Sequence, residues 1–419
     1  MHSLLKCFVV LVLLAGIVLL PACDEDDIEI GTLLPLTGDL SQFGGPMQEG
    51  ARLAIEQVNQ NGGVLGKNIR LVNEDSETSP TTAASAMIKL VNVDKVPVVI
   101  GAAGSSVSMA IISIAVDNKV VQISPSNTAT GFTTFPDDGF YFRTCPSDAL
   151  QGKAMAKLAS EKGYMTANTL AINNDYGVGF EGVFVREFEA MGGEVNRKVR
   201  YSPEATTFDS EVNKVAEGDP DVIILIGYPE TGSIILKSAY QNGLMDDIEW
   251  LFSEGLRSPG LADLIGKNDD NAYVIAGFEG TTPDPRMAGP AHGEFENAYK
   301  DKYDKDSTTF VPNTYDAAAI VALAIEKAGR DEDGEVKADW KLTGEAIRDA
   351  IPDVTNPNGE PVADIGEALE LIRAGKDINY QGASGELTFD DDGDVTGSYC
   401  IWQVGSDGSI ELGDSIEIE

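Results

Sequence analysis

Small hydroxyl side chains follow two neighbouring apolar runs of the chain. Ser105 and Ser106 come after the first run, and Ser126 and Thr128 come after the second. Such runs predict parallel strands, and loops at the carboxyl ends of neighbouring strands lie side by side in the ligand crevice. Ser106 also opens a predicted helix, whose free N–H groups and positive dipole end attract anions. The stretch predicts a site for a small anion, most simply a carboxylate, although ordinary helix caps and loops have the same residues.

Apolar runs and helical patterns alternate through most of the chain. The predicted strands are 28–34, 69–73, 98–100, 120–123, 141–144, 169–173, 195–201, 222–227, 250–252, 273–278, 385–390 and 399–404. A helix, a glycine pair and a strand follow one another twice, at Gly62-Gly63 and at Gly192-Gly193. These two similar series predict an α/β protein with two doubly wound parallel-sheet lobes and a cleft between them.

Acidic residues outnumber basic residues by more than two to one. The chain of 419 residues has 68 acidic and 30 basic residues, and its formal net charge is −38. This charge repels nucleic acids and anionic lipid surfaces, so we expect neither as a partner. The length is sufficient for two domains with sizeable cores.

Residues 1–23 are typical of a lipoprotein signal peptide. Lys6 precedes thirteen apolar or small residues, 8–20, which are fewer than the roughly 20 that cross a bilayer. The sequence LPAC, which ends at Cys23, resembles a lipobox, in which the cysteine is lipidated and becomes the mature N-terminus. Plain cleavage near Ala22 is the alternative. We therefore expect a lipid-anchored monomer in the periplasm or on the outer face of the cytoplasmic membrane.

Two cysteines remain in the body of the chain, Cys145 and Cys400. An isolated pair in an oxidising compartment forms a disulfide more often than it stays free, so we predict a bond between them. Two cysteines without a CxxC or HExxH motif do not make a zinc site.

Three motifs suggest other functions, and each lacks a part that its chemistry needs. Residues 177–182 match GxGxxG after a strand, but the next strand ends on Tyr201 instead of an acid for a dinucleotide ribose. The run 390–394 resembles the start of a calcium loop, but Val395 stands where the loop needs glycine. A hydrolase triad needs a histidine base, and His292 is the one histidine after the signal segment, with no GxSxG motif. We therefore expect no cofactor, no metal and no catalysis.

Short motifs spread in order along the chain carry a family resemblance. They are GTLLPLTG at 31–38, GARLAIEQVNQNGGVLG at 50–66, IGAAGSS at 100–106, ISPSNT at 123–128, NDYG at 174–177, SEG at 253–255 and QGASG at 381–385. Together they resemble the periplasmic amino-acid-binding proteins of the leucine/isoleucine/valine type. The similarity extends from residue 28 to residue 412.

The resemblance implies how the two lobes are connected. A type I periplasmic binding protein has three hinge crossings, which would lie near Arg143, Glu279 and Ser384. The N-terminal lobe would comprise 28–143 plus 280–384, and the C-terminal lobe would comprise 144–279 plus 385–419. Such lobes close by a hinge motion, favoured by contacts that only the closed form completes.

The resemblance also implies how a zwitterionic amino acid is held. The hydroxyls of Ser105 and Thr128, with backbone N–H groups of the first lobe, would receive its carboxylate. A backbone carbonyl of the loop at Ser126 and Asn127 would accept from its ammonium group. Glu254 would pair with the ammonium, because a cation removed from water needs a charged partner. Without the family pattern, a solvated loop acid is the simpler interpretation of Glu254.

Three aromatic residues complete the implied site. Phe43, Tyr176 and Tyr228 would cover the apolar side chain of the ligand, although ordinary strand-end aromatics are the alternative. The implied protein is an extracytoplasmic receptor that captures a branched-chain or other apolar amino acid and delivers it to an ABC permease. The alternatives are a receptor for a related amide or modified amino acid, a sensor that signals through a partner, and an exported enzyme.

Overall fold

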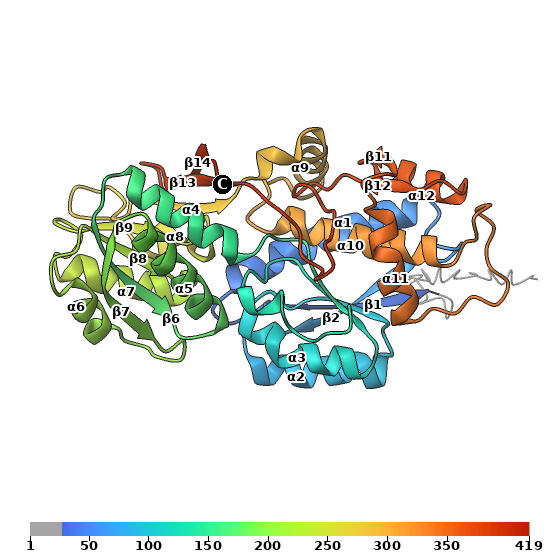
Figure 1. The fold of residues 1–419 in the computed structure, drawn as a ribbon, viewed down its shortest axis with the longest axis horizontal. Coiled ribbons are helices and arrows are strands. Elements are labelled where there is room, and N and C mark those ends of the chain that lie inside the picture. Colours follow the sequence, from blue (N-terminus) through green and yellow to red (C-terminus); the bar gives the residue numbers. More distant parts are fainter. Residues whose placement is uncertain (1–26, 419) are drawn as a thin grey trace, which may run out of the picture.

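The chain forms two main sheets, which belong to two lobes that lie side by side along the long axis of the molecule (Figure 1). The computed structural model describes residues 27–418. The first sheet has the strand order β2-β1-β3-β4-β5, and all neighbouring strands are parallel. Its strands are β1 (Ile28–Leu34), β2 (Ile69–Asp75), β3 (Val98–Gly101), β4 (Val121–Ser124) and β5 (Tyr141–Arg143).

The second sheet repeats this order at its centre. Its strand order is β14-β13-β10-β9-β8-β6-β7, with β6 to β10 parallel and β13 and β14 antiparallel at one edge. Its strands are β6 (Thr166–Ile172), β7 (Glu194–Tyr201), β8 (Val222–Ile226), β9 (Glu249–Phe252), β10 (Glu279–Pro283), β13 (Tyr399–Val404) and β14 (Ile410–Ile416). In each sheet the strand order reverses beside the first strand, and α/β proteins bind ligands in the crevice outside the carboxyl ends at such a point. The two doubly wound lobes predicted from the sequence are confirmed.

Helices pack against both sheets (Figure 1). Those of the first lobe are α1 (Ser41–Gln60), α2 (Pro80–Lys89), α3 (Ser105–Asp117), α9 (Pro290–Tyr303), α10 (Val311–Ala328), α11 (Gly344–Val354) and α12 (Ile365–Arg373). Two short strands, β11 (Glu360–Val362) and β12 (Ile378–Tyr380), pair beside them. Residues 311–326 of α10 are all buried, and residues 317–325 at its centre are all apolar, as expected of a helix that packs on every side.

The second lobe has five α-helices among the described residues, and the first two begin with side-chain caps at the cleft. The five helices are α4 (Asp148–Glu161), α5 (Asp175–Ala190), α6 (Asp209–Ala216), α7 (Pro229–Gln241) and α8 (Leu261–Ile265). Ser147 caps α4 by accepting a hydrogen bond from the Ala149 N–H, and Asn174 caps α5 by accepting one from the Gly177 N–H. These caps fix where α4 and α5 start, and therefore which of their residues reach the cleft.

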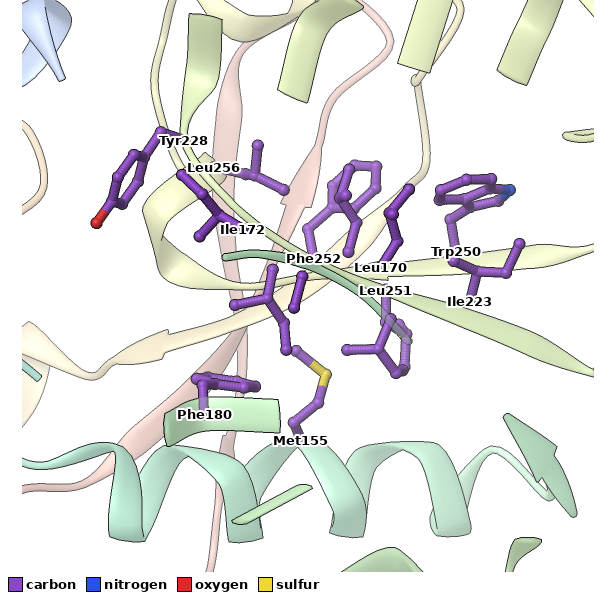
Figure 2. Packing of buried hydrophobic residues seen from close by; sticks show 14 of the residues in the cluster. Met155, Leu170, Ile172, Phe180, Ile223, Tyr228, Trp250, Leu251, Phe252 and Leu256 are labelled. Carbon is purple, nitrogen blue, oxygen red and sulfur yellow. The ribbon is translucent and has the colours of Figure 1, made fainter. Parts of the chain in front are cut away.

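The core of the second lobe lies directly behind the cleft. Figure 2 shows Met155 of α4 and Phe180 of α5 close to Leu170 and Phe252 of the sheet. All four side chains are fully buried. Tyr228 belongs to the same cluster, so the packed core supports an aromatic residue predicted to line the cleft.

The chain crosses between the lobes three times, and two crossings lie later than the sequence predicts. The first crossing follows β5. The predicted boundary at 279/280 is early, because Glu279–Pro283 pairs along its whole length with β13 of the second sheet. The predicted boundary at 384/385 is also early, because Leu387 and Val395 pack in the core of the first lobe.

Two predicted strands do not form in the described part of the chain. In 273–278 only Tyr273 makes an isolated bridge, with Lys267, and the strand begins at Glu279. The run 385–390 contains only the bridge residue Gly385. An apolar run becomes a strand only where a neighbouring strand offers a pairing edge. For 273–278 this edge, between β9 and β13, is occupied by the polar strand β10, which follows it in the chain.

The predicted disulfide between Cys145 and Cys400 is wrong, since both thiols are buried and free. Cys145 lies in the apolar core of the second lobe. Cys400 lies opposite Thr282 in the sheet, near Asp284 and Arg286. Burial raises the pKa of the Cys400 thiol to about 11 and also raises that of Cys145, so both stay as unreactive thiols.

The predicted signal peptide, residues 1–23 with Cys23, lies outside the described residues. Within residues 27–418, no helix is both long and apolar enough to cross a membrane. The same residues contain no group of three or more histidine, cysteine, aspartate or glutamate side chains that could hold a metal ion.

Candidate ligand-binding site

A cavity lies between the two lobes, at the carboxyl ends of strands from both sheets. Its empty volume, which includes space open to solvent, is about 350 Å³. The first lobe contributes Leu40, Phe43, Met47, Ala103, Ser105, Ser126, Thr128 and Phe310, and the second contributes Tyr176, Tyr228, Glu254 and Gly255. All the predicted site residues except Ser106 and Asn127 therefore line one cavity.

Hydroxyl groups of the first lobe line the cavity around the N-terminus of α3. Ser105 is the first residue of α3 and follows Gly104, which adopts an extended conformation. Ser105 Oγ accepts a hydrogen bond from the Ala129 N–H (3.4 Å), and Ser126 Oγ donates to the Ala103 carbonyl (3.0 Å). These bonds join the loops that follow β3 and β4. The positive dipole end of α3 and the hydroxyls together suit an anionic ligand group.

Glu254 brings the negative charge of the site from the second lobe. It begins a short 3₁₀ turn directly after β9 and is 2% exposed. Its Oε2 accepts hydrogen bonds from the Gln151 amide (2.6 Å) and from the Tyr176 hydroxyl (2.9 Å). Burial raises the pKa of the Glu254 carboxyl to about 7, and these hydrogen bonds oppose the rise. Among the described residues that line the cavity, Glu254 is the only one with a charged side chain.

Two tyrosines form one wall of the cavity. The rings of Tyr176 and Tyr228 are stacked, with centroids 5.5 Å apart and planes inclined by 9°. A Cβ atom at Gly255 would lie 2.5 Å from the Gly227 carbonyl oxygen and 3.1 Å from the Tyr176 hydroxyl. Glycine at position 255 is therefore required for the loop with Glu254 to lie against the tyrosines.

Ser106 lies outside the cavity. Its hydroxyl donates to Asp175 Oδ2 of the other lobe (2.6 Å) and accepts from the Asp175 N–H (2.8 Å). Successive residues of a helix point about 100° apart, so Ser105 and Ser106 cannot both face the same cavity. Ser106 is therefore a contact between the lobes.

Asn127 supports the site from behind. It is fully buried, and its backbone carbonyl accepts a hydrogen bond from Arg143 Nη1 (3.1 Å) instead of facing the cavity. The same Nη1 donates to the Ala129 carbonyl (2.9 Å). Arg143 therefore fixes the backbone on both sides of Thr128, and it is itself held by a buried ion pair with Asp394.

Five lining residues were not predicted from the sequence: Leu40, Met47, Ala103, Gly255 and Phe310. Met47 follows Phe43 by four residues in α1, and this helical spacing could have placed both on one face. Phe310 has a left-handed backbone (φ +66°) directly before α10, and no local pattern indicates its position in the cleft.

The lobes are in direct contact around the cavity, so the described conformation is a closed one. Asp39 accepts hydrogen bonds from the N–H (2.9 Å) and the hydroxyl (3.0 Å) of Thr231. Gln42 Nε2 donates to Glu230 Oε1 (3.1 Å). Each bond joins the start of a helix in the first lobe to α7 of the second.

Comparison with known families agrees with this geometry. Residues 27–409 match the family described as periplasmic binding protein. The chain belongs to this family. It is 30% identical over 329 residues to the leucine-, isoleucine-, valine-, threonine- and alanine-binding protein of Pseudomonas aeruginosa, covering 77% of this chain and 82% of that protein. It is 26% identical over 404 residues to the chemotactic signal transduction system substrate-binding protein BasB of Halobacterium salinarum, covering 92% and 88%.

Solved structures have the same two-lobed fold. The leucine-binding protein LivK of Thermotoga maritima has a TM-score of 0.77 at 28% identity, covering 93% of this chain and 99% of that one. A solute-binding protein of R. palustris in complex with benzoate has a TM-score of 0.72 at 18% identity, covering 93% and 96%. The predicted resemblance is confirmed, and the protein is a binding protein and not an enzyme. The family indicates an extracytoplasmic location.

Proposed function

We propose that this periplasmic binding protein captures an amino acid with an apolar side chain and delivers it to an ABC importer. The observation that carries the proposal is the lining of a single cavity. Hydroxyls and a helix N-terminus come from one lobe, and a buried carboxylate comes from the other. A zwitterion has one charged group to match each of these features.

The rest of the lining indicates the kind of side chain that the ligand carries. Leu40, Phe43, Met47, Tyr228 and Phe310 offer apolar or aromatic surface. No lining residue among those described is left to pair with a second charge on the ligand, because Glu254 is matched by the ammonium group. A charged side chain would therefore be buried unpaired, which is unfavourable, whereas an apolar one gains from leaving water.

The experiment is a thermal-shift screen of the purified protein against the twenty amino acids. A ligand that binds only the folded state raises the melting temperature in proportion to RT ln(1 + [L]/Kd). We expect a selective rise with leucine, isoleucine, valine or another apolar amino acid. A rise only with charged amino acids, or with none of the twenty, would contradict the proposal.

A second candidate function is sensing. It is favoured by the match to BasB of Halobacterium salinarum, which is named for chemotactic signal transduction and aligns with 92% of this chain. Both functions use the same ligand site and differ only in the membrane partner. Deletion of the gene should lower uptake of labelled ligand if the partner is an importer, and should abolish chemotaxis toward the ligand if the partner is a receptor.

We further propose that the protein is a monomer tethered to the membrane by lipid on Cys23. The Cys23→Ala variant should then move from the membrane fraction to the soluble fraction, with unchanged ligand affinity, because the residues after Cys23 precede the fold. Fractionation and immunoblotting measure this, with Cys7→Ala as the matched control. A Cys23→Ala protein that stays in the membrane fraction would disprove the anchor.

A further inference from the structure

A second buried acid, Asp148, adjoins the cavity without lining it. It is the first residue of α4 and is fully buried. Its N–H donates to the Thr128 carbonyl (2.7 Å), so its backbone touches a residue that lines the cavity. The charge of Glu254 acts on its carboxyl group. Neither oxygen of the Asp148 carboxyl has a hydrogen-bond partner among the described residues.

The two buried acids differ in the donors around them. Glu254 receives hydrogen bonds from Gln151 and Tyr176, which stabilise its ionised form. Arg143 lies near Asp148, but all five of its N–H groups are already donated, to Asp394, Thr133 and the carbonyls of Asn127 and Ala129. The Thr128 hydroxyl is the one donor near Asp148 among the described residues, and a buried carboxylate with so few donors is strongly disfavoured in its charged form.

The other titratable groups around Asp148 offer it no positive charge. They are Glu254 after β9, Tyr176 on α5, Tyr399 on β13 and Cys145 after β5. Burial raises the pKa of each of these phenol and thiol groups, so they stay neutral. Burial and the charge of Glu254 likewise raise the pKa of Asp148 well above its usual range.

We infer that Asp148 is a positioning residue that keeps a proton, so that Glu254 is the single carboxylate presented to the ammonium group of the ligand. This inference rests on the proposed function for the identity of the ligand. If both acids were ionised, two negative charges would face one positive charge in a closed site. With the proton on Asp148, one negative charge, on Glu254, faces the one positive charge of the zwitterion.

The proton on Asp148 also determines what Thr128 offers to the ligand. The Thr128 side chain is close enough to lower the pKa of Asp148. An ionised Asp148 would take the hydroxyl hydrogen of Thr128 and leave only lone pairs toward the cavity. A protonated Asp148 does not need this hydrogen, so Thr128 can donate it to the carboxylate of the ligand.

The test compares Asp148→Asn with the wild type, because asparagine has the shape of the protonated acid and cannot ionise. Calorimetric titration with L-leucine at pH 7 should show a loss in affinity of less than tenfold. Glu254→Gln, the matched change of the other acid, should lose about a hundredfold or more. A loss of tenfold or more for Asp148→Asn would show that its charge is used and would overturn the inference.

A second measurement needs no ligand. A folded-state pKa above the unfolded value means that the folded protein holds a proton which the unfolded chain releases above about pH 4. The contribution of Asp148 to wild-type stability therefore falls as pH rises. Asp148→Asn lacks this loss. Its melting temperature relative to wild type should therefore increase between pH 4.5 and pH 8, and a constant difference would overturn the inference.

Infrared spectra of the wild type provide an answer even if Asp148→Asn does not fold. At pH 8 Glu254 is mostly ionised, since its pKa is about 7. The C=O band of a protonated carboxyl should nevertheless remain, because Asp148 keeps its proton. Absence of that band would overturn the inference. Failure of the wild type to bind any amino acid would disprove the proposed function instead, and the thermal and infrared results would still decide where the proton lies.

Discussion

Replacing Glu254 by glutamine should weaken ligand binding by about two to four decades in Kd. The substitution keeps the shape of the side chain but leaves the ammonium group of the ligand without its counter-charge in a closed site. Breaking a buried pair in this way costs roughly 3–5 kcal/mol. Calorimetric titration of both proteins with the best ligand of the screen measures the change. Glu189→Gln, on the exposed end of α5, is the matched control and should bind like the wild type.

The same carboxylate predicts how affinity depends on pH. The pKa of Glu254 is about 7 without ligand, and the ammonium group stabilises the ionised form. Binding below this pH must therefore release a proton, so affinity should fall by up to about tenfold per pH unit below pH 7. Glu254→Gln should lose this dependence. An affinity for Glu254→Gln within a few-fold of wild type, or a flat wild-type profile, would show that Glu254 does not bind the ligand.

Replacing Asp394 by alanine should lower the free energy of unfolding by roughly 3–5 kcal/mol. Arg143 is fully buried and donates to both oxygens of Asp394, from Nε (2.5 Å) and from Nη2 (2.6 Å). Without Asp394 a buried guanidinium has no counter-charge. Because Arg143 also holds the carbonyls of Asn127 and Ala129 on either side of Thr128, ligand affinity should fall together with stability.

Urea unfolding followed by circular dichroism measures this loss of stability. Asp392→Ala is the control, since Asp392 lies in the same turn but is exposed. The control should unfold at nearly the same urea concentration as the wild type. If Asp394→Ala differs from wild type by less than about 1 kcal/mol, the pair contributes only what an exposed ion pair does, and Arg143 is held by its other contacts.

Local sequence patterns were sufficient to predict the cavity-lining residues that follow strands. Ser105, Thr128, Tyr228 and Glu254 each come shortly after a short apolar run, and parallel strands bring such positions together at one edge. Local patterns were not sufficient to predict which way a side chain at the start of a helix points. Ser106 opens the same helix as Ser105 but contacts the opposite lobe, because one step along a helix turns the side chain by about 100°.

Partners far apart in the sequence could not be predicted from local patterns. Asp394 and Arg143 are 251 residues apart, and the acidic run around Asp394 is typical of an exposed turn. The turn does form, with Asp390 Oδ1 accepting from two backbone N–H groups, but its last carboxylate is directed at Arg143. The disulfide prediction failed for a similar reason. The number of cysteines and the compartment do not determine where either thiol lies or which way it points.

The most direct test of the proposed function is a calorimetric comparison of L-leucine with two analogues that each lack one charged group. 4-Methylpentanoate lacks the ammonium group, and 3-methylbutylamine lacks the carboxylate. The buried Glu254 and the hydroxyls of the first lobe predict that leucine binds and that each analogue binds at least about a hundredfold more weakly. If 4-methylpentanoate bound as tightly as leucine, the site would recognise a simple carboxylic acid, and the assignment to an amino acid would be wrong.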